Sequence, residues 1–163
     1  MKKTTSDVLQ DGLISGFIGY GLISLYFALL NVIAGKPAWL TAQTFGDALF
    51  SGSFPGQMIA YNGAHLVTFV VLGVIAALLI KEVELHPAIW YVAMFVAIAG
   101  FIVTYSFMTV IAGVVAKIDP VTVITGNVVA AVGMGAFLLL RHPQLARVVR
   151  EQGEREEAEY HPA

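Results

Sequence analysis

The chain has 163 residues, of which 58% are hydrophobic and 12% are charged, and its mean hydropathy is +0.79. A soluble domain carries about 25% charged residues, so this composition excludes an ordinary cytosolic fold and a disordered chain. The net charge of −2 gives no basic field for nucleic acid, and the absence of cysteine excludes disulfides, thiolate metal sites and a cysteine nucleophile. A small integral membrane protein remains.

Four stretches without Asp, Glu, Lys or Arg are each long enough to cross a hydrocarbon core of about 30 Å as a helix. We predict transmembrane helices at residues 12–34, 57–80, 88–116 and 121–140. Prolines near their ends support these limits, because proline breaks a helix interior but is tolerated in the first turn. The predicted fold class is all-α: a polytopic membrane protein with a four-transmembrane-helix bundle, whose membrane domain covers residues 1–140.

The distribution of basic residues predicts the orientation of this bundle. With four crossings, both termini lie on the same side as the loop between the second and third helices. That side carries seven of the nine Lys and Arg residues, whereas Lys36 and Lys117 lie on the other. The positive-inside rule then places both termini in the cytoplasm. A cleaved signal peptide is the competing interpretation of the first segment, but Asp7 and Asp11 and the length of the apolar run disfavour it.

Two segments outside the spans have patterns of their own. Residues 36–56, in the outer loop, place apolar side chains at a roughly helical period with Asp47 on the other side, which predicts a short amphipathic helix in the membrane interface. A lid over an outward-facing pocket is the alternative interpretation. Residues 141–163 are predicted to form a charged cytoplasmic tail, with a short apolar stripe from Leu145 to Val149 before a solvated charged run.

Polar side chains gather in the outer half of the predicted bundle. On the second span, Tyr61, Asn62 and His65 share one face at three- and four-residue spacing. An unpaired polar group in hydrocarbon costs several kcal/mol, so His65 needs a partner such as Tyr105, Asn127 or a bound headgroup. Three interpretations stay open: a hydrogen-bonded packing network, a quinone, lipid or pigment site formed by these five residues, and a proton relay.

The sequence supports neither an enzyme nor a metal centre. Only His65 lies inside a span away from its ends, so no second histidine is placed to complete a haem with it. His86 and His142 each precede a proline at the cytoplasmic boundary, and we interpret them as boundary-marking residues, since a metal site there lacks ligands even with Glu84. No serine-hydrolase, zinc-protease or phosphate-loop motif occurs. We therefore expect no catalytic residue, no metal, and no cofactor other than a bound lipid, quinone or pigment.

Small residues recur on one face of the first span and on one face of the fourth. In lipid, such faces let two helix backbones approach closely. The positions are Gly12, Gly16 and Gly19 on the first span and Gly126, Ala130 and Gly133 on the fourth. They favour either packing inside the bundle or docking onto another membrane subunit.

Four short motifs carry a family resemblance over most of the chain. They are Gly16-x-x-Gly19, the run from Asn31 to Pro37, His65-x-x-x-Phe69-x-x-x-Gly73, and Arg141-His142-Pro143 at the end of the last span. In these motifs the chain resembles a family of small bacterial four-helix integral membrane proteins, many of which carry Asp where this sequence has Asn31. The resemblance implies a fold and a location in a bacterial inner membrane, with no activity to transfer.

The leading functional hypothesis is a non-catalytic accessory subunit of a larger bacterial respiratory or photosynthetic membrane complex. It would dock through its glycine-rich faces, with larger subunits and lipid as partners. The alternative is a protein that binds a quinone, lipid or pigment in the outer leaflet, and a small transporter or channel is third. Neither nucleic acid nor a soluble small-molecule substrate is expected as a partner.

Overall fold

Four long helices dominate residues 4–160, the range that the computed structural model describes, with side chains placed except at positions 146, 152 and 155–160. The helices are α1 (Thr5–Ile33), α3 (Gly56–Leu85), α4 (Trp90–Val115) and α5 (Pro120–Arg141), and a 3-10 turn, η1 (Pro87–Ile89), leads into α4. Each of the four, with η1 counted to α4, is long and apolar enough to cross a membrane. The predicted all-α, four-helix membrane fold is confirmed.

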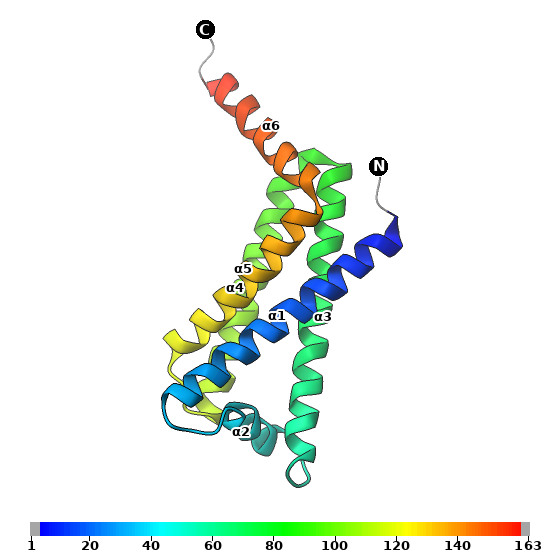
Figure 1. Ribbon diagram of the computed structural model, residues 1–163. Helices are drawn as coiled ribbons and strands as arrows, with labels where there is room; N and C mark the ends of the chain where they lie inside the picture. The colour runs from blue at the N-terminus through cyan, green and yellow to red at the C-terminus, as the bar shows by residue number, and fades with distance from the viewer. Residues whose placement is uncertain (1–3, 161–163) are drawn as a thin grey trace.

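Two shorter helices lie at opposite ends of this bundle. The predicted short helix of the first loop is α2 (Leu40–Leu49), and α6 (Pro143–Tyr160) follows α5. Figure 1 shows α2 lying across one end, while α6 extends beyond the other, where α1 also begins. We call these the α2 end and the α6 end. The division of the chain at residue 140 into a membrane domain and a tail stays a prediction.

The first helix begins at Thr5, earlier than the predicted span at residue 12, and Asp7 helps to cap its first turn. The Thr4 backbone N–H donates to Asp7 Oδ2 at 2.9 Å, and the Asp7 N–H donates to Thr4 Oγ1 at 3.2 Å. This capping box satisfies N–H groups that the first turn leaves without a helical partner. Asp11 is fully buried further along the same helix. Asp7 and Asp11 therefore lie within α1 and do not prevent the helix from forming there.

The bundle is organised around the crossing of α1 and α3, which Figure 1 shows as two rods that touch and then diverge toward α2. A Cβ atom added at Gly12 would lie 2.6 Å from Val74 Cα, and one added at Gly16 would lie 2.5 Å from Val70 Cα. Gly73 meets the backbone of Gly12 and Gly16 from the other side. Only hydrogen atoms fit between the two backbones at this point.

The fourth transmembrane helix, α5, packs on the other side of α1 through a layer of larger side chains. Ile23 of α1, Phe69 of α3 and Ala130 and Met134 of α5 are buried together in one cluster. Small residues on α5 make room for side chains of α1: Gly126 faces Tyr26, and Gly133 faces Leu22. The small-residue faces of both helices are therefore occupied by contacts within the chain.

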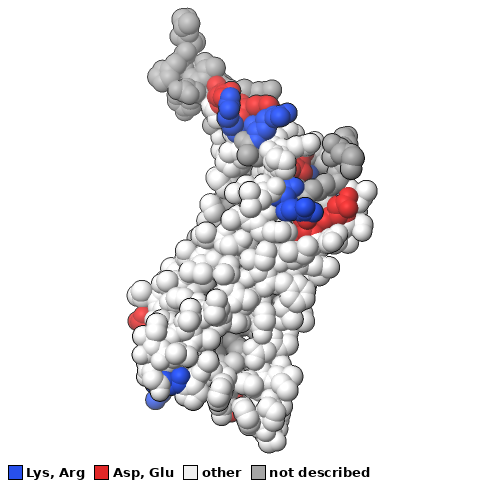
Figure 2. All heavy atoms as spheres, in the orientation of Figure 1, with Lys and Arg blue, Asp and Glu red and all other residues white. Residues whose placement is uncertain are grey.

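The helix α4 lies at the edge of the bundle. Ala112 is its one buried residue within the described range, where it joins Phe45 of α2 and Val123 of α5. Most of its large apolar side chains are exposed, as on a helix that faces lipid. Figure 2 shows charged side chains gathered toward the two ends of the visible face, with an uncharged band between them. This distribution agrees with a protein that spans a bilayer.

The close approach of α1 and α3 leads to a stability prediction for Gly16→Ala. The new methyl group would collide with the α3 backbone, so we expect the free energy of unfolding to fall by about 1–3 kcal/mol. Unfolding in detergent, followed by circular dichroism, measures this change. Gly21→Ala is the matched control, because Gly21 lies on the same helix with open space around it. Equal stability of the two variants would contradict the proposed backbone contact.

Candidate functional site

A cavity of about 320 Å³ opens between α1 and α3 on the α2 side of their crossing. The two helices diverge there, and the space-filling view shows the surface hollowed in the same region (Figure 2). Three predicted site residues, Tyr61, Asn62 and His65, line this cavity from α3. The remaining lining residues come from α1, α2 and the loop between them: Ile23, Ser24, Phe27, Ala28, Ala38, Trp39, Thr41 and Ala42, with Met58 from α3.

The His65 ring sits among aromatic rings. Its centroid lies 5.3 Å from that of Tyr61, 5.2 Å from that of Phe69 and 6.0 Å from that of Tyr20. Phe45 of α2 stacks on Tyr61 at 5.2 Å with an interplanar angle of 8°. These contacts fix the orientation of both rings by packing. The predicted hydrogen-bonding partners of His65, Tyr105 and Asn127, are replaced by aromatic neighbours.

The polar side chains that α3 contributes to the cavity differ in their hydrogen bonding. The Tyr20 hydroxyl donates to Asn62 Oδ1 at 3.0 Å, and Asn62 Nδ2 donates to the Met58 carbonyl at 2.8 Å. Within residues 4–160, the structure gives no hydrogen bond to the side chains of Tyr61 or His65. Both line the cavity, so their polar atoms are available to a bound molecule.

A second, smaller cavity of about 170 Å³ shares Tyr61 and His65 with the first and extends toward α4 and α5. Asn127 lines it, although its Nδ2 atom donates to the Val123 carbonyl of its own helix at 2.9 Å. Tyr105 lines neither cavity. It stacks with Phe101 on α4 at 6.5 Å instead. The five predicted residues therefore do not line one cavity: three line the first, Asn127 lines only the second, and Tyr105 lines neither, although it packs against the same buried cluster as Tyr61.

The segment from Ala38 to Leu49 forms a wall of the cavity. Asn31 Nδ2 donates to the Ala38 carbonyl at 3.2 Å and to Thr41 Oγ1 at 3.0 Å, which ties the start of α2 to the end of α1. Gly46 is buried against the backbone of Gln57 at the start of α3. Trp39 stays 54% exposed while it lines the cavity. The exposed Trp39 is what an interfacial helix would have, and the position of the segment against the cavity is what a lid would have. The segment has features of both interpretations.

Each predicted small-residue position makes contacts inside the chain. Gly12 and Gly16 meet α3, Gly19 meets Met134 of α5 and Phe69 of α3, and Ala130 is 1% exposed in the core. Gly126 and Gly133 face side chains of α1. Of the two interpretations of these positions, the contacts correspond to packing within the bundle.

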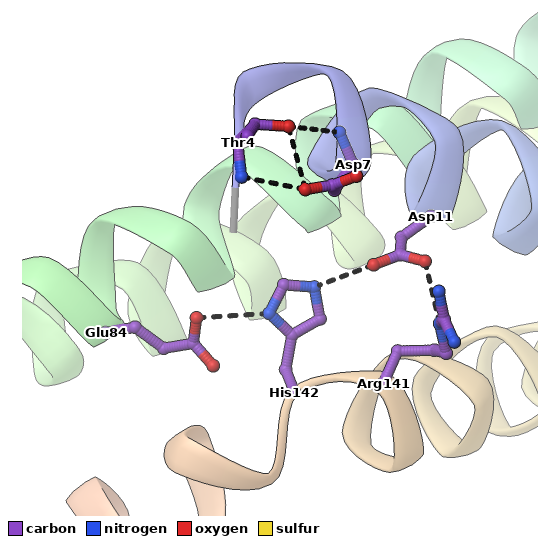
Figure 3. A network of polar contacts seen from close by, with 6 residues as sticks. All are labelled: Thr4, Asp7, Asp11, Glu84, Arg141 and His142. Atoms are coloured by element: carbon purple, nitrogen blue, oxygen red, sulfur yellow. Dashed lines mark hydrogen bonds and ion pairs between the residues drawn. The ribbon is translucent and has the colours of Figure 1, made fainter. Parts of the chain in front are cut away.

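Sequence analysis missed a polar cluster at the α6 end, shown in Figure 3. Arg141 Nε donates to Asp11 Oδ1 at 2.9 Å, and the His142 ring lies between Asp11 and Glu84. His142 is the C-cap of α5, in keeping with its interpretation as a boundary residue, but its side chain is 1% exposed and takes part in this cluster, which that interpretation did not include. The missed signal is the four-residue spacing of Asp11 and Ser15, each of which directly precedes a glycine of the small-residue face of α1. Within the described residues, no group of three His, Asp or Glu side chains is arranged to hold a metal ion.

Comparison of the chain with protein-family models, with curated proteins and with solved structures finds no match. The resemblance to small bacterial four-helix membrane proteins therefore stays a prediction.

The Asn31 bridge predicts how firmly α2 is held. In Asn31→Leu the two hydrogen bonds to the 38–41 segment are lost, at about 1 kcal/mol for a typical hydrogen bond, and local opening becomes several-fold more frequent. Amide hydrogen exchange of residues 40–49 measures this opening. Thr125→Val is the control, because its hydroxyl bonds only the Val121 carbonyl of its own helix. Unchanged exchange in the Asn31 variant would show that other contacts hold α2.

Proposed function

We propose that this protein binds a small, uncharged, ring-bearing lipophilic molecule, with a quinone as the chemical class, in the cavity at the α2 end. One observation carries the proposal: His65 and Tyr61 line an apolar cavity without a hydrogen bond within the described residues. Small-molecule sites are typically apolar cavities of roughly 300–1,000 Å³ with a few polar groups that fix orientation. A cavity of about 320 Å³ lies at the lower end of that range.

The lining of the cavity favours a neutral ligand. None of its lining residues is Lys, Arg, Asp or Glu. A phosphate headgroup in a site of low polarity needs cationic side chains or several N–H donors. A carbonyl oxygen on a ring needs only one donor, which either the imidazole N–H of His65 or the hydroxyl of Tyr61 supplies. This difference supports a quinone over a phospholipid headgroup.

The surrounding contacts supply orientation and an apolar environment. The Tyr20–Asn62 hydrogen bond and the Phe45–Tyr61 stack hold the polar wall in place before a ligand arrives. Ile23, Phe27 and Met58 offer apolar surface to the rest of the molecule. The proposed activity is binding, without a chemical step. From the distribution of basic residues, we further propose that the termini lie in the cytoplasm, which would place the cavity near the outer surface. That the membrane is a bacterial inner membrane is proposed from the family resemblance alone.

Replacing His65 by Phe tests this proposal, because Phe keeps the ring contacts and removes the hydrogen bond. We expect the dissociation constant of a short-chain benzoquinone to rise about tenfold, since one hydrogen bond contributes up to about 1.5 kcal/mol. The measurement is quenching of Trp39 fluorescence in a Trp90→Phe background, because the chain has 2 tryptophans and Trp39 lines the cavity.

His86→Phe is the control for that experiment, since His86 is exposed at the α6 end of α3. We expect it to bind the quinone as the parent protein does. Quenching that is equally strong in the His65 and His86 variants would reject the assignment of the ligand to this cavity.

An accessory subunit of a larger membrane complex is the second candidate, and the exposure of α4 favours it. The small-residue faces are used inside the chain, so docking would instead use the outer face of α4, where Phe95, Val103 and Val110 are more than 60% exposed. A photoreactive residue at Val103 is expected to form adducts of defined mass with larger subunits in the native membrane. The same residue at Phe17 of α1 is the control. A monomer without adducts from position 103 would count against this role.

A further inference from the structure

The α6 end carries a buried polar cluster that lies apart from the proposed ligand cavity. His142 ends α5, where its N–H donates to the Leu138 carbonyl at 2.9 Å, and Pro143 begins α6 directly after it. Its side chain is turned into the bundle and is 1% exposed. Figure 3 shows the ring between Asp11 of α1 and Glu84 of α3. One residue at the α5–α6 junction thus contacts two other transmembrane helices.

Both ring nitrogens of His142 face a carboxylate. Nδ1 lies 3.2 Å from Glu84 Oε2, and Nε2 lies 3.5 Å from Asp11 Oδ2. A neutral imidazole has one N–H and one bare lone pair. Either tautomer would therefore point a lone pair at an anionic oxygen. An imidazolium presents an N–H to each carboxylate, so the arrangement has a place for one additional proton.

Two described groups contact Asp11 from different sides. Asp11 Oδ1 accepts from Arg141 Nε at 2.9 Å, while its Oδ2 atom faces His142. Glu84 contacts the other ring nitrogen of His142, so a protonated ring would carry a positive charge between the two carboxylates. The side chains of Asp11 and His142 have no exposed surface, so solvent screens this pair little. His142 Nε2 has no hydrogen-bond partner at ideal geometry, which leaves the contact with Asp11 electrostatic.

The other charged groups described near the α6 end have partners of their own or are exposed, so they do not take the place of a proton on His142. On α3, Lys81 donates to Thr5 Oγ1 at 3.1 Å, and Glu82 is exposed. On α1, Asp7 forms the capping box with Thr4. On α6, Arg150 pairs with Glu154 at 2.9 Å with both side chains largely exposed. Arg147 and Glu151 of α6 are exposed, and His142 is the group that the structure places against the half-buried Glu84 carboxylate.

We propose that Asp11, Glu84 and His142 form a proton-binding site, in which the protonated His142 ring fastens the α5–α6 junction to α1 and α3. Removing the proton leaves a lone pair against a carboxylate and weakens the attachment of α6. The site is a conformational device within the fold and is independent of the proposed quinone cavity, because none of its residues lines that cavity.

Nitrogen NMR of ring-labelled histidine, on the protein in lipid bilayers at neutral pH, tests the proposal directly. The chain has 4 histidines, so a variant with His65→Phe, His86→Gln and His161→Gln leaves His142 as the single signal. We expect both ring nitrogens of His142 to carry hydrogen. A spectrum with one bare ring nitrogen would overturn the proposal, and no change at the cluster itself is needed for this measurement.

A pair of neighbouring variants tests the role of the carboxylate. In Glu84→Gln we expect His142 to become neutral and the amide exchange of residues 145–149 to speed up several-fold. Glu82→Gln is the matched control, because Glu82 is exposed two residues earlier on the same helix, and it should change neither readout. A His142 ring that stays doubly protonated in Glu84→Gln, or α6 exchange that stays at the control rate, would overturn the proposed fastening role.

Discussion

The contact between the backbones of α1 and α3 is the constraint from which the rest of the arrangement follows. Gly12 and Gly16 allow α1 to reach the backbone of α3 at Gly73, a closeness that any side chain would prevent. Two straight helices that touch at one point must separate on both sides of it. Toward α2 the separation leaves the cavity, and toward α6 it admits the side chain of His142. Helix association in lipid depends on such packing because lipid gives no hydrophobic drive between helices.

The two sides of the crossing satisfy polar groups in different ways. At the α6 end, the carboxylate of Asp11 meets Arg141 and His142, and that of Glu84 meets His142, so the acidic groups lie against basic side chains. At the α2 end, Asn62 is bonded to Tyr20, whereas His65 and Tyr61 are held by ring contacts. A buried polar group without a hydrogen-bond partner is costly. A ligand in the cavity would supply such partners to His65 and Tyr61. We assign binding to that end and fastening of α6 to the other.

The wall formed by α2 connects the fold to the proposed binding function. It is held by Asn31 at its start and by the burial of Phe45 and Gly46 at its centre. These contacts are fewer than those between α1 and α3. A segment with few buried contacts opens more readily than the core around it. Entry of a lipophilic molecule past α2 would therefore leave the α1–α3 crossing intact.

The sequence by itself determined the membrane class, the four helices and the short helix of the first loop. These features depend on local properties: uncharged runs of sufficient length, prolines at their ends and the spacing of apolar residues. It also placed Tyr61, Asn62 and His65 on one face, because that relation needs only the helical period. Tertiary structure alone decided that Tyr105 does not line the cavity with these residues and that Asp11, Glu84 and His142 meet. Those relations depend on how far each helix is rotated and where it crosses its neighbours, and backbone contacts at a few glycines set both.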